Sequence, residues 1–274
     1  MQGLLDFIIA IFFWFLFPAN FFQKFSITTN DVFEDINNLH LPAANIMMEH
    51  SFRKVANTIQ RSPAFELHGC QISTELRQYE EKMGIVGHSL KEIYSKGSKI
   101  YESIDKEIEK MIIQLDSGFI YFISRGDARY FEERINVLIT VIKEFKQLVN
   151  KGHSSIHDLE EIKYNNKGNI EDGLRGAEDC IRNGDCDSKY VDDITKAKKE
   201  LKIVYNIFDQ LDNTKGNLNK MNKILTNYEA NLMGISAELY GISKFTYTRV
   251  DLKRLRQTSN HLKNYRFKFL MKSL

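Results

Sequence analysis

Two cysteines stand close enough in the sequence to form a staple. Cys180 and Cys186 flank Asn183 and Gly184, a pair that is typical of a turn. In an oxidising compartment a disulfide between the cysteines would close this turn, and in a reducing compartment they would be two small apolar residues. The sequence leaves both interpretations open. The third cysteine, Cys70, has no evident mate.

The histidines offer one cluster with the spacing of metal ligands. His153 and His157 are four residues apart, and Glu160 and Glu161 follow on the same side of a helix. Three of these side chains would converge on a metal ion if the helix were continuous. Gly152 predicts a helix end just before His153, however, so we expect no metal site here.

Sequence motifs for catalysis are incomplete. Gly87, His88 and Ser89 lack the second glycine of a nucleophile elbow, and no phosphate-binding loop ends in Gly-Lys-Ser/Thr. Asn183, Asp185 and Asp187 alternate as calcium-loop ligands do, but the required glycine and glutamate positions that follow are occupied by other residues. We therefore expect no enzyme, no cofactor and no metal.

Basic and aromatic side chains alternate near the carboxyl end, from Tyr265 to Lys272, and Asp251 is the only acid after Lys244. Such a pattern is typical of contact with an anionic lipid surface or with single-stranded nucleic acid. Nucleic acid is the less expected of these two partners. The simpler interpretation is a solvated helix end whose cations complement the helix dipole and face the acidic region Ser154–Asp193. The candidate residues for lipid contact are Lys253, Arg254, Arg256, Arg266 and Lys268.

The amino-terminal run Leu4–Phe22 is apolar on every side, with Asp6 as its only ionisable side chain. Its length favours an uncleaved membrane anchor. Its compact core favours a cleaved signal peptide, although Asp6 replaces the basic residues expected there and Phe17 is large for a cut after Ala19. If the run is an anchor, Lys24 after it predicts a cytosolic body. The candidate membrane residues are Phe7, Ile8, Ile9, Ile11, Phe12, Phe13, Trp14, Phe15, Leu16 and Phe17.

Long helices must position all of these residues. From Ile72 to Phe122 apolar residues recur at alternating spacings of four and three, which predicts one long packed helix. Gly97 lies in this seam, where it would let a partner backbone approach. Arg125, Gly126 and Asp127 predict a tight turn, and a second seam over Ala128–Lys151 completes an antiparallel hairpin that ends at Gly152.

The carboxyl half repeats the same spacing. Short helices and a turn are predicted over 154–188, and the seam resumes over 190–242, as one helix or as two joined near Asn213. Gly234 and Gly241, seven residues apart, suggest a second place for close backbone approach. A last helix begins near Thr248, with Asp251 completing a partial capping box.

These elements predict an all-α, elongated antiparallel helical bundle with coiled-coil-like seams, preceded by an apolar membrane segment. No proline occurs after Pro63, which fits an almost wholly helical body. The predicted parts are residues 1–25 (signal peptide or anchor), 26–70 (short helices and linker), 71–152 (long helical hairpin), 153–188 (acidic, glycine-interrupted connector) and 189–274 (long helices with a basic tail).

Two stretches resemble a family of long-helix proteins of filamentous fungi. The first is Met83–Tyr101, with Gly87, His88, Ser89, Leu90, Ile93 and Tyr94 followed by Gly97 and Tyr101, and the second is Val250–Leu262 with its spaced leucines. The resemblance covers about a third of the chain. It implies an all-helical body and carries over no activity and no functional residue.

The sequence predicts a membrane-associated or secreted structural protein that presents a long helical surface to a protein partner or to a second copy. Its location would be the membrane if the amino-terminal segment is a single anchor, and the exterior if the segment is cleaved. The alternative is a membrane-active effector or α-helical pore former, in which an apolar segment inserts into a target bilayer.

Overall fold

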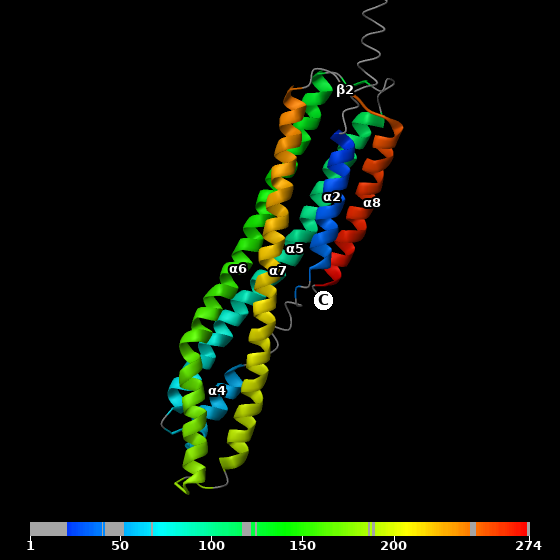
Figure 1. Ribbon diagram of the computed structural model, residues 1–274. Coiled ribbons are helices and arrows are strands. Elements are labelled where there is room, and N and C mark those ends of the chain that lie inside the picture. Colours follow the sequence, from blue (N-terminus) through cyan, green and yellow to red (C-terminus); the bar gives the residue numbers. More distant parts are fainter. Residues whose placement is uncertain are drawn as a thin grey trace, which may run out of the picture. The chain divides into compact units, whose positions relative to one another are not determined.

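The computed structural model describes residues 21–39, 41, 52–66, 68–116, 122–123, 125–185, 187, 190–241 and 245–272. These residues form an all-helical bundle with two very short strands (Figure 1). The elements are α2 (Phe21–Asn38), α4 (Phe52–Arg61), a 3-10 turn η1 (Pro63–Phe65), α5 (Gly69–Asp116), β1 (Phe122–Ile123), α6 (Arg125–Arg182), α7 (Val191–Gly241), β2 (Phe245–Thr246) and α8 (Arg249–Met271).

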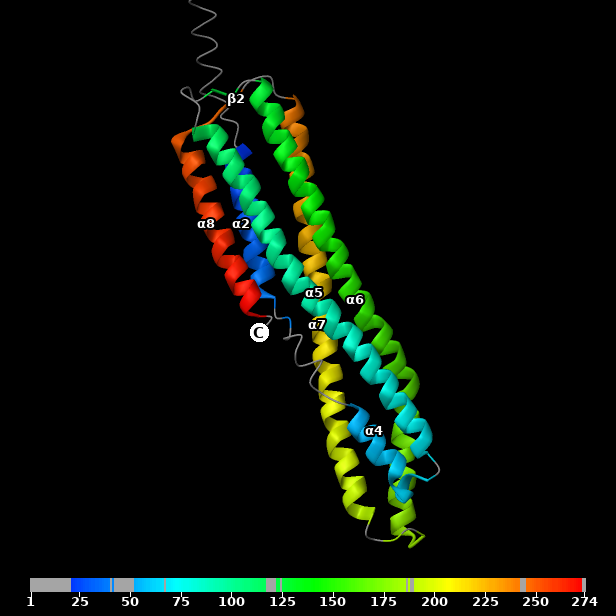
Figure 2. The same ribbon diagram turned by 180° about the vertical axis from the view of Figure 1, so that it is seen from behind.

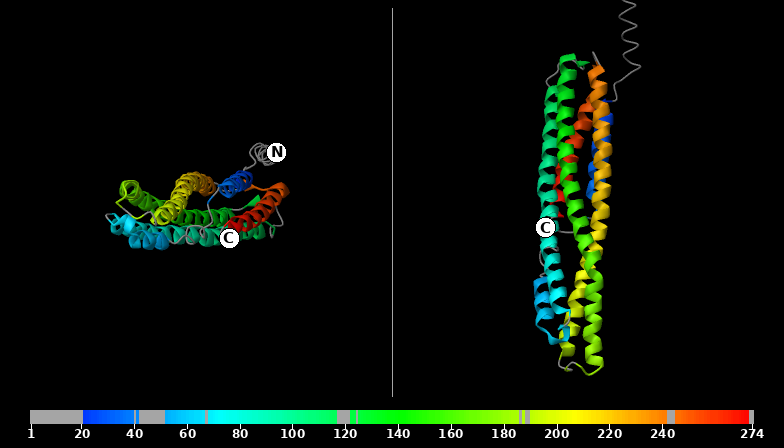
Figure 3. Two further views of the ribbon diagram at one scale, coloured as in Figure 1. Left: turned by 90° about the horizontal axis from the view of Figure 1, so that it is seen from below. Right: turned by 90° about the vertical axis from the view of Figure 1, so that its left-hand side faces the viewer.

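The described residues divide into two compact units. Unit 1 contains the described residues within 21–39, 96–146 and 222–270, and unit 2 those within 41–95, 147–221 and 271–272. Helices α5, α6 and α7 each contribute one part to unit 1 and another to unit 2. Figure 3 shows each of these three helices as one continuous ribbon.

The predicted seam of α5 is confirmed, because its apolar positions from Ile72 to Leu115 are buried. Gly97 is buried too, but it faces aromatic rings and not a partner backbone. A Cβ there would lie 2.7 Å from Cε1 of Phe269 and 3.2 Å from the ring of Phe145. The helix ends at Asp116, short of the predicted Phe122, which belongs to β1.

Helix α6 corrects two predictions. It begins at Arg125, so the expected turn at Arg125–Asp127 is its first turn. It also runs without interruption past Gly152 to Arg182, where short helices were expected. Gly152 is a seam position: a Cβ there would lie 2.7 Å from Cδ1 of Ile93 on α5, so glycine accommodates that side chain in its present position.

Pairs between the helices confirm the antiparallel arrangement within each unit. In unit 1, Gln114 and Glu107 of α5 bind Asp127 and Arg134 of α6, so rising numbers on one helix meet falling numbers on the other. In unit 2, Lys151 of α6 bonds Glu92 of α5 at 2.8 Å.

Helix α7 is one continuous helix, which answers the question left open over 190–242. The apolar spacing is interrupted in the sequence because a polar residue, Thr214, occupies a buried position. The Thr214 hydroxyl donates to the Gln210 carbonyl at 2.7 Å.

Helix α2 is the centre of unit 1. The sequence predicted only short helices and linker over 26–70, whereas α2 begins at Phe21 and runs to Asn38. Figures 1 and 2 show α2 beside α5 and α8, and side chains of α2 contact four other helices. These contacts are the Phe22–Phe131 ring pair to α6, Asn37 to the Tyr101 hydroxyl of α5, Thr29 to the Tyr228 hydroxyl of α7, and the Tyr265 hydroxyl of α8 to Glu34.

Short elements close the ends of the helices. Strands β1 and β2 pair antiparallel, with Phe122 opposite Thr246, a feature that the sequence did not predict. The capping box of α8 is confirmed: the Thr248 backbone N–H donates to Asp251 Oδ2 at 2.8 Å and the Asp251 N–H donates to Thr248 Oγ1 at 3.2 Å. In unit 2, α4 ends at Arg61, and its Phe52 ring lies 6.5 Å from that of Tyr79 on α5.

Candidate interaction surfaces

The histidine cluster is an ion-pair site between α6 and α7. Because α6 is continuous, His153 and His157 do lie on one helix. Nδ1 of His157 is 3.7 Å from Oε2 of Glu160, and Lys215 of α7 contacts both side chains. Burial raises the pKa of the Glu160 carboxyl, whereas the hydrogen bond and the charge of Lys215 lower it. The lowering effects together are larger, so the pKa lies below its ordinary value. A lysine thus binds this carboxylate, and the described residues hold no cluster of metal ligands.

The turn that follows α6 has the geometry predicted from Asn183 and Gly184. Gly184 adopts φ +80, its N–H donates to the Ile181 carbonyl, and the Asp185 N–H donates to the Cys180 carbonyl at 2.9 Å. These two bonds define a Schellman cap, which needs glycine at the left-handed position. Cys180 is disulfide-bonded, whereas Cys70 is free and exposed. Cys186 lies outside the described residues, so its pairing with Cys180 stays a prediction.

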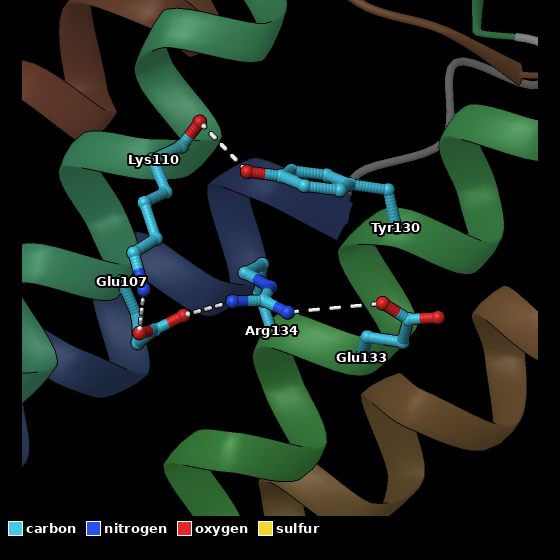
Figure 4. Close-up of polar contacts among 5 residues, drawn as sticks. All are labelled: Glu107, Lys110, Tyr130, Glu133 and Arg134. Carbon is cyan, nitrogen blue, oxygen red and sulfur yellow. Dashed lines mark hydrogen bonds and ion pairs between the residues drawn. The ribbon is translucent and has the colours of Figure 1, made fainter.

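A charged cluster joins α5 to α6 in unit 1 (Figure 4). The buried carboxylate of Glu107 accepts from Lys110 Nζ at 2.6 Å and from Arg134 Nη1 at 3.1 Å. The guanidinium of Arg134 also lies 5.3 Å from the ring centre of Tyr130 and 3.7 Å from Glu133. Two cations therefore neutralise Glu107, and the cluster links α5 to α6.

Four buried tyrosines lie on the helix seams and bond polar atoms of other segments. The Tyr228 and Thr29 hydroxyls are 2.8 Å apart, Asn37 Nδ2 donates to the Tyr101 hydroxyl at 3.2 Å, and the Tyr94 hydroxyl donates to the Leu41 carbonyl at 2.8 Å. Burial raises the pKa of each phenol above its ordinary value, so these groups stay protonated. The fourth, Tyr79, shows the same shift. Tyr79 and Tyr228 lie within the two seams predicted from the sequence, over 72–122 and 190–242, but the spacing of a seam does not indicate bonding partners on other helices.

The cations predicted for lipid contact are divided along α8. Arg256 bonds Asp116 at 2.8 Å, and Arg266 bonds Glu102 at 2.8 Å and Ser98 at 3.2 Å. Both pair with α5 instead of the acidic region Ser154–Asp193. Of the other three predicted cations, Lys253 and Lys268 are exposed and Arg254 is half-buried.

Residues that the sequence analysis did not single out complete this contact. The Ser259 hydroxyl donates to Asp105 Oδ1 at 2.6 Å, and Lys263 bonds Glu109 at 2.7 Å. We call the whole contact the α5–α8 charged seam, formed by Ser98, Glu102, Asp105, Glu109 and Asp116 of α5 with Arg256, Ser259, Lys263 and Arg266 of α8.

The outer face of α7 in unit 1 carries exposed uncharged side chains. Met233 is 54% and Tyr240 is 81% exposed. A Cβ at Gly234 or Gly241 would meet no atom within 4 Å. The predicted close backbone approach at these glycines is therefore wrong for the described residues, where both glycines face open space.

Helix ends gather where α2 begins, and we call this part of unit 1 the α2 pole. Lys24 of α2 bonds Glu238 in the last turns of α7 at 2.7 Å, and Phe22 packs on Phe131 near the start of α6. The Tyr247 hydroxyl, just before α8, donates to the carbonyl of Leu115 near the end of α5 at 2.6 Å. The pole comprises Phe21–Lys24, Ile113–Asp116, Arg125–Phe131, Glu238–Gly241 and Phe245–Lys253.

The predicted membrane residues Phe7–Phe17 lie outside the described residues. The last two residues of the apolar run do not: Phe21 and Phe22 are 3% and 0% exposed in the core of unit 1. Within the described part of the chain, no helix is both long and apolar enough to cross a bilayer. Compared with known proteins, the chain matches no protein-family model and no curated protein.

Proposed function

We propose that this chain is a membrane-associated helical interaction protein. The apolar run that begins at Leu4 would hold it at a bilayer, and the folded helices would present their outer faces to a protein partner or to a second copy. The observation that supports this proposal best is the burial of Phe21 and Phe22, which end that run. The run therefore leads directly into the core of unit 1, and a bilayer that holds the run would also hold the bundle.

Burial of these two phenylalanines also shortens the apolar run that is free to meet lipid. The length of the run without these two residues is close to the lower end of the roughly 17–25 residues that span a bilayer. A cleaved signal peptide, which has a shorter apolar core, remains the competing form of the proposal and would give a secreted bundle.

The outer face of α7 supports the second half of the proposal. Large apolar side chains such as Met233 and Tyr240 lie on it beside small residues, with few charges between them. Charge depletion with exposed aromatic and methionine side chains is typical of protein interfaces.

Intact mass and membrane retention test the tether. We expect protein from its source cells to keep its full-length mass and to stay with membranes after a carbonate wash. Phe12→Asp, which interrupts the apolar run, should move the protein into the wash, whereas the matched change Phe267→Asp at an exposed site on α8 should not. A mass that lacks the amino-terminal segment, with the body in the soluble fraction, would replace the anchored form by the secreted one. Dye release from vesicles would instead favour the pore-forming alternative.

A further inference from the structure

The α2 pole exposes large apolar side chains at three helix ends. Ile113 lies one turn from the end of α5, Tyr240 lies in the last turn of α7, and Val250 lies in the first turn of α8. They are 68%, 81% and 55% exposed. An aromatic and two aliphatic side chains at one end of a bundle match the composition that favours the headgroup level of a membrane.

Charges at the pole are unevenly paired. Two acids of the pole pair with cations, Asp116 with Arg256 and Glu238 with Lys24. The other two, Asp127 and Asp251, accept from the neutral side chains of Gln114 and Thr248. The exposed cations Arg129 and Lys253, in contrast, make no ion pair among the described residues. Arg129 and Lys253 therefore give the pole two cations that can meet an anionic partner.

The chain itself leads from the pole into its most apolar segment. Helix α2 starts there, and Phe21 and Phe22, the last residues of the apolar run, are buried in the core of unit 1. A short apolar run in lipid brings the residues that flank it to the interface. Anionic headgroups would then face Arg129 and Lys253, since cations near an anionic leaflet are attracted to it.

We propose that the α2 pole is a docking surface for an anionic bilayer, with Ile113, Tyr240 and Val250 at headgroup depth and Arg129 and Lys253 toward lipid phosphates. This inference rests on the proposed membrane association and adds which surface meets the lipid. It also divides the basic set predicted from the sequence: Lys253 belongs to the docking surface, whereas Lys268, near the opposite end of α8, does not.

Tryptophan quenching by brominated lipids tests the surface on the full chain. Trp14 is the only tryptophan, so a Trp14→Phe background allows one new reporter at a time. The reporters are Tyr240→Trp and Val250→Trp at the pole and Met271→Trp at the far end of α8, where the native side chain is also exposed. In vesicles of phosphatidylcholine with phosphatidylserine, we expect strong quenching of the two pole reporters and little quenching at position 271.

Charge-removing variants at the pole and at a control site test whether the docking surface needs its cations. Adding Arg129→Gln and Lys253→Gln to the Val250→Trp protein should lower its quenching in phosphatidylserine vesicles, whereas Lys268→Gln should leave it unchanged. Leaving out phosphatidylserine should have the same effect as the double change. Equal quenching of positions 250 and 271, or no effect of the double change, would overturn the proposal. Far-ultraviolet circular dichroism confirms that each variant keeps its helices.

The unaltered protein separates this inference from the proposed function. If Trp14 is quenched and the pole reporters are not, the tether stands and the docking surface is wrong. If Trp14 and the pole reporters are all unquenched, both proposals fail. Quenching of the pole reporters without quenching of Trp14 would retain the docking surface and remove the tether.

Discussion

Two pairs of buried polar side chains in unit 1 join segments that are far apart in the sequence. Thr29 of α2 and Tyr228 of α7 are both fully buried, and their hydroxyls form a hydrogen bond with each other. Ser259 and Asp105 form a similar pair between α8 and α5. A buried polar atom that loses its partner costs more than the net gain from the bond, so each pair selects one register of its two helices.

Removing one hydroxyl of the Thr29–Tyr228 pair should destabilise the protein. We expect Tyr228→Phe to lower the free energy of unfolding by about 1–3 kcal/mol, because the Thr29 hydroxyl is left buried without this partner. Adding Thr29→Val to the same protein should recover much of the loss. Urea unfolding of both single variants and the double variant measures the coupling, and strictly additive losses would show that the bond contributes nothing.

Asp105 should make stability depend on pH. Burial raises the pKa of its carboxyl, and this effect outweighs the opposing effects of the Ser259 hydrogen bond and the Lys263 charge. A group whose folded pKa is raised adds stability that is fully present below its unfolded pKa, about 4, and is lost as the pH rises through the folded value. The stability of the unaltered protein relative to Asp105→Asn should therefore increase as the pH falls from 7 toward about 4.

A second carboxylate of the same seam provides a control of opposite sign. The pKa of Glu102 is lowered, first by the hydrogen bond from Lys106 and then by the charge of Arg266. Its contribution is present above its ordinary pKa and is lost as the pH falls. Stability relative to Glu102→Gln should thus decrease on acidification, as measured by urea unfolding across the same pH series. If both variants gave the same slope, the assignment of the two shifts would be wrong.

At the scale of the elements, glycines inside the long helices have two different environments. Gly97 of α5 faces the rings of Phe145 and Phe269, whereas Gly234 of α7 faces open space. The same substitution at the two positions therefore separates packing from helix propensity.

Alanine should have opposite effects at these glycines. We expect Gly97→Ala to destabilise the protein by about 1–3 kcal/mol, because its Cβ needs space that two aromatic rings occupy. Gly234→Ala should stabilise it by up to about 1 kcal/mol, the difference in helix propensity. Thermal unfolding of both variants is the measurement. A stabilising Gly97→Ala would mean that the rings have room to move.

Periodic features of the elements could be predicted from the sequence, and contacts between them could not. The seam from Ile72 to Leu115 and the Thr248–Asp251 capping box depend on neighbours within one helix, so their spacing is sufficient evidence. Gly152 depends on Ile93 of another helix, and a glycine that accommodates a partner side chain looks the same in sequence as one that ends a helix. For the same reason the basic character of α8 was evident, while its acidic partners on α5 were not.

The α2 pole shows the same limit for the candidate site. The apolar run and Lys253, which lies on the proposed docking surface, could be identified from the sequence, but nothing in the sequence groups Ile113, Tyr240 and Val250. These residues are far apart in the chain, and only the meeting of three helix ends brings them together.

At the scale of the whole molecule, the chain builds two cores from interleaved segments. Unit 1 contains the Phe33, Tyr101 and Tyr228 rings, and unit 2 contains the Tyr79 and Phe208 rings, whose centres are 5.2 Å apart. Each core therefore needs parts of α5, α6 and α7 together with its own shorter helices.

Truncating one buried phenylalanine in each unit should show whether the two cores unfold separately. Phe33→Ala and Phe208→Ala should each cost about 3–5 kcal/mol, because both side chains are buried. Under native conditions, hydrogen exchange should accelerate mainly in unit 1 for Phe33→Ala and mainly in unit 2 for Phe208→Ala. The same exchange pattern in both variants would show that the two cores open as one cooperative unit.

The hydrogen bond between Thr29 and Tyr228 can form only after most of the chain has been synthesised. Its partners are 199 residues apart in the chain. At about 5–20 residues per second, a ribosome would make Tyr228 roughly 10–40 s after Thr29. During that interval α2 has no finished core in which to bury Phe21 and Phe22. Any factor that binds the amino-terminal region on the ribosome therefore encounters it before the bundle has formed. If the apolar run directs the chain to a membrane, as proposed, we expect that step to precede folding.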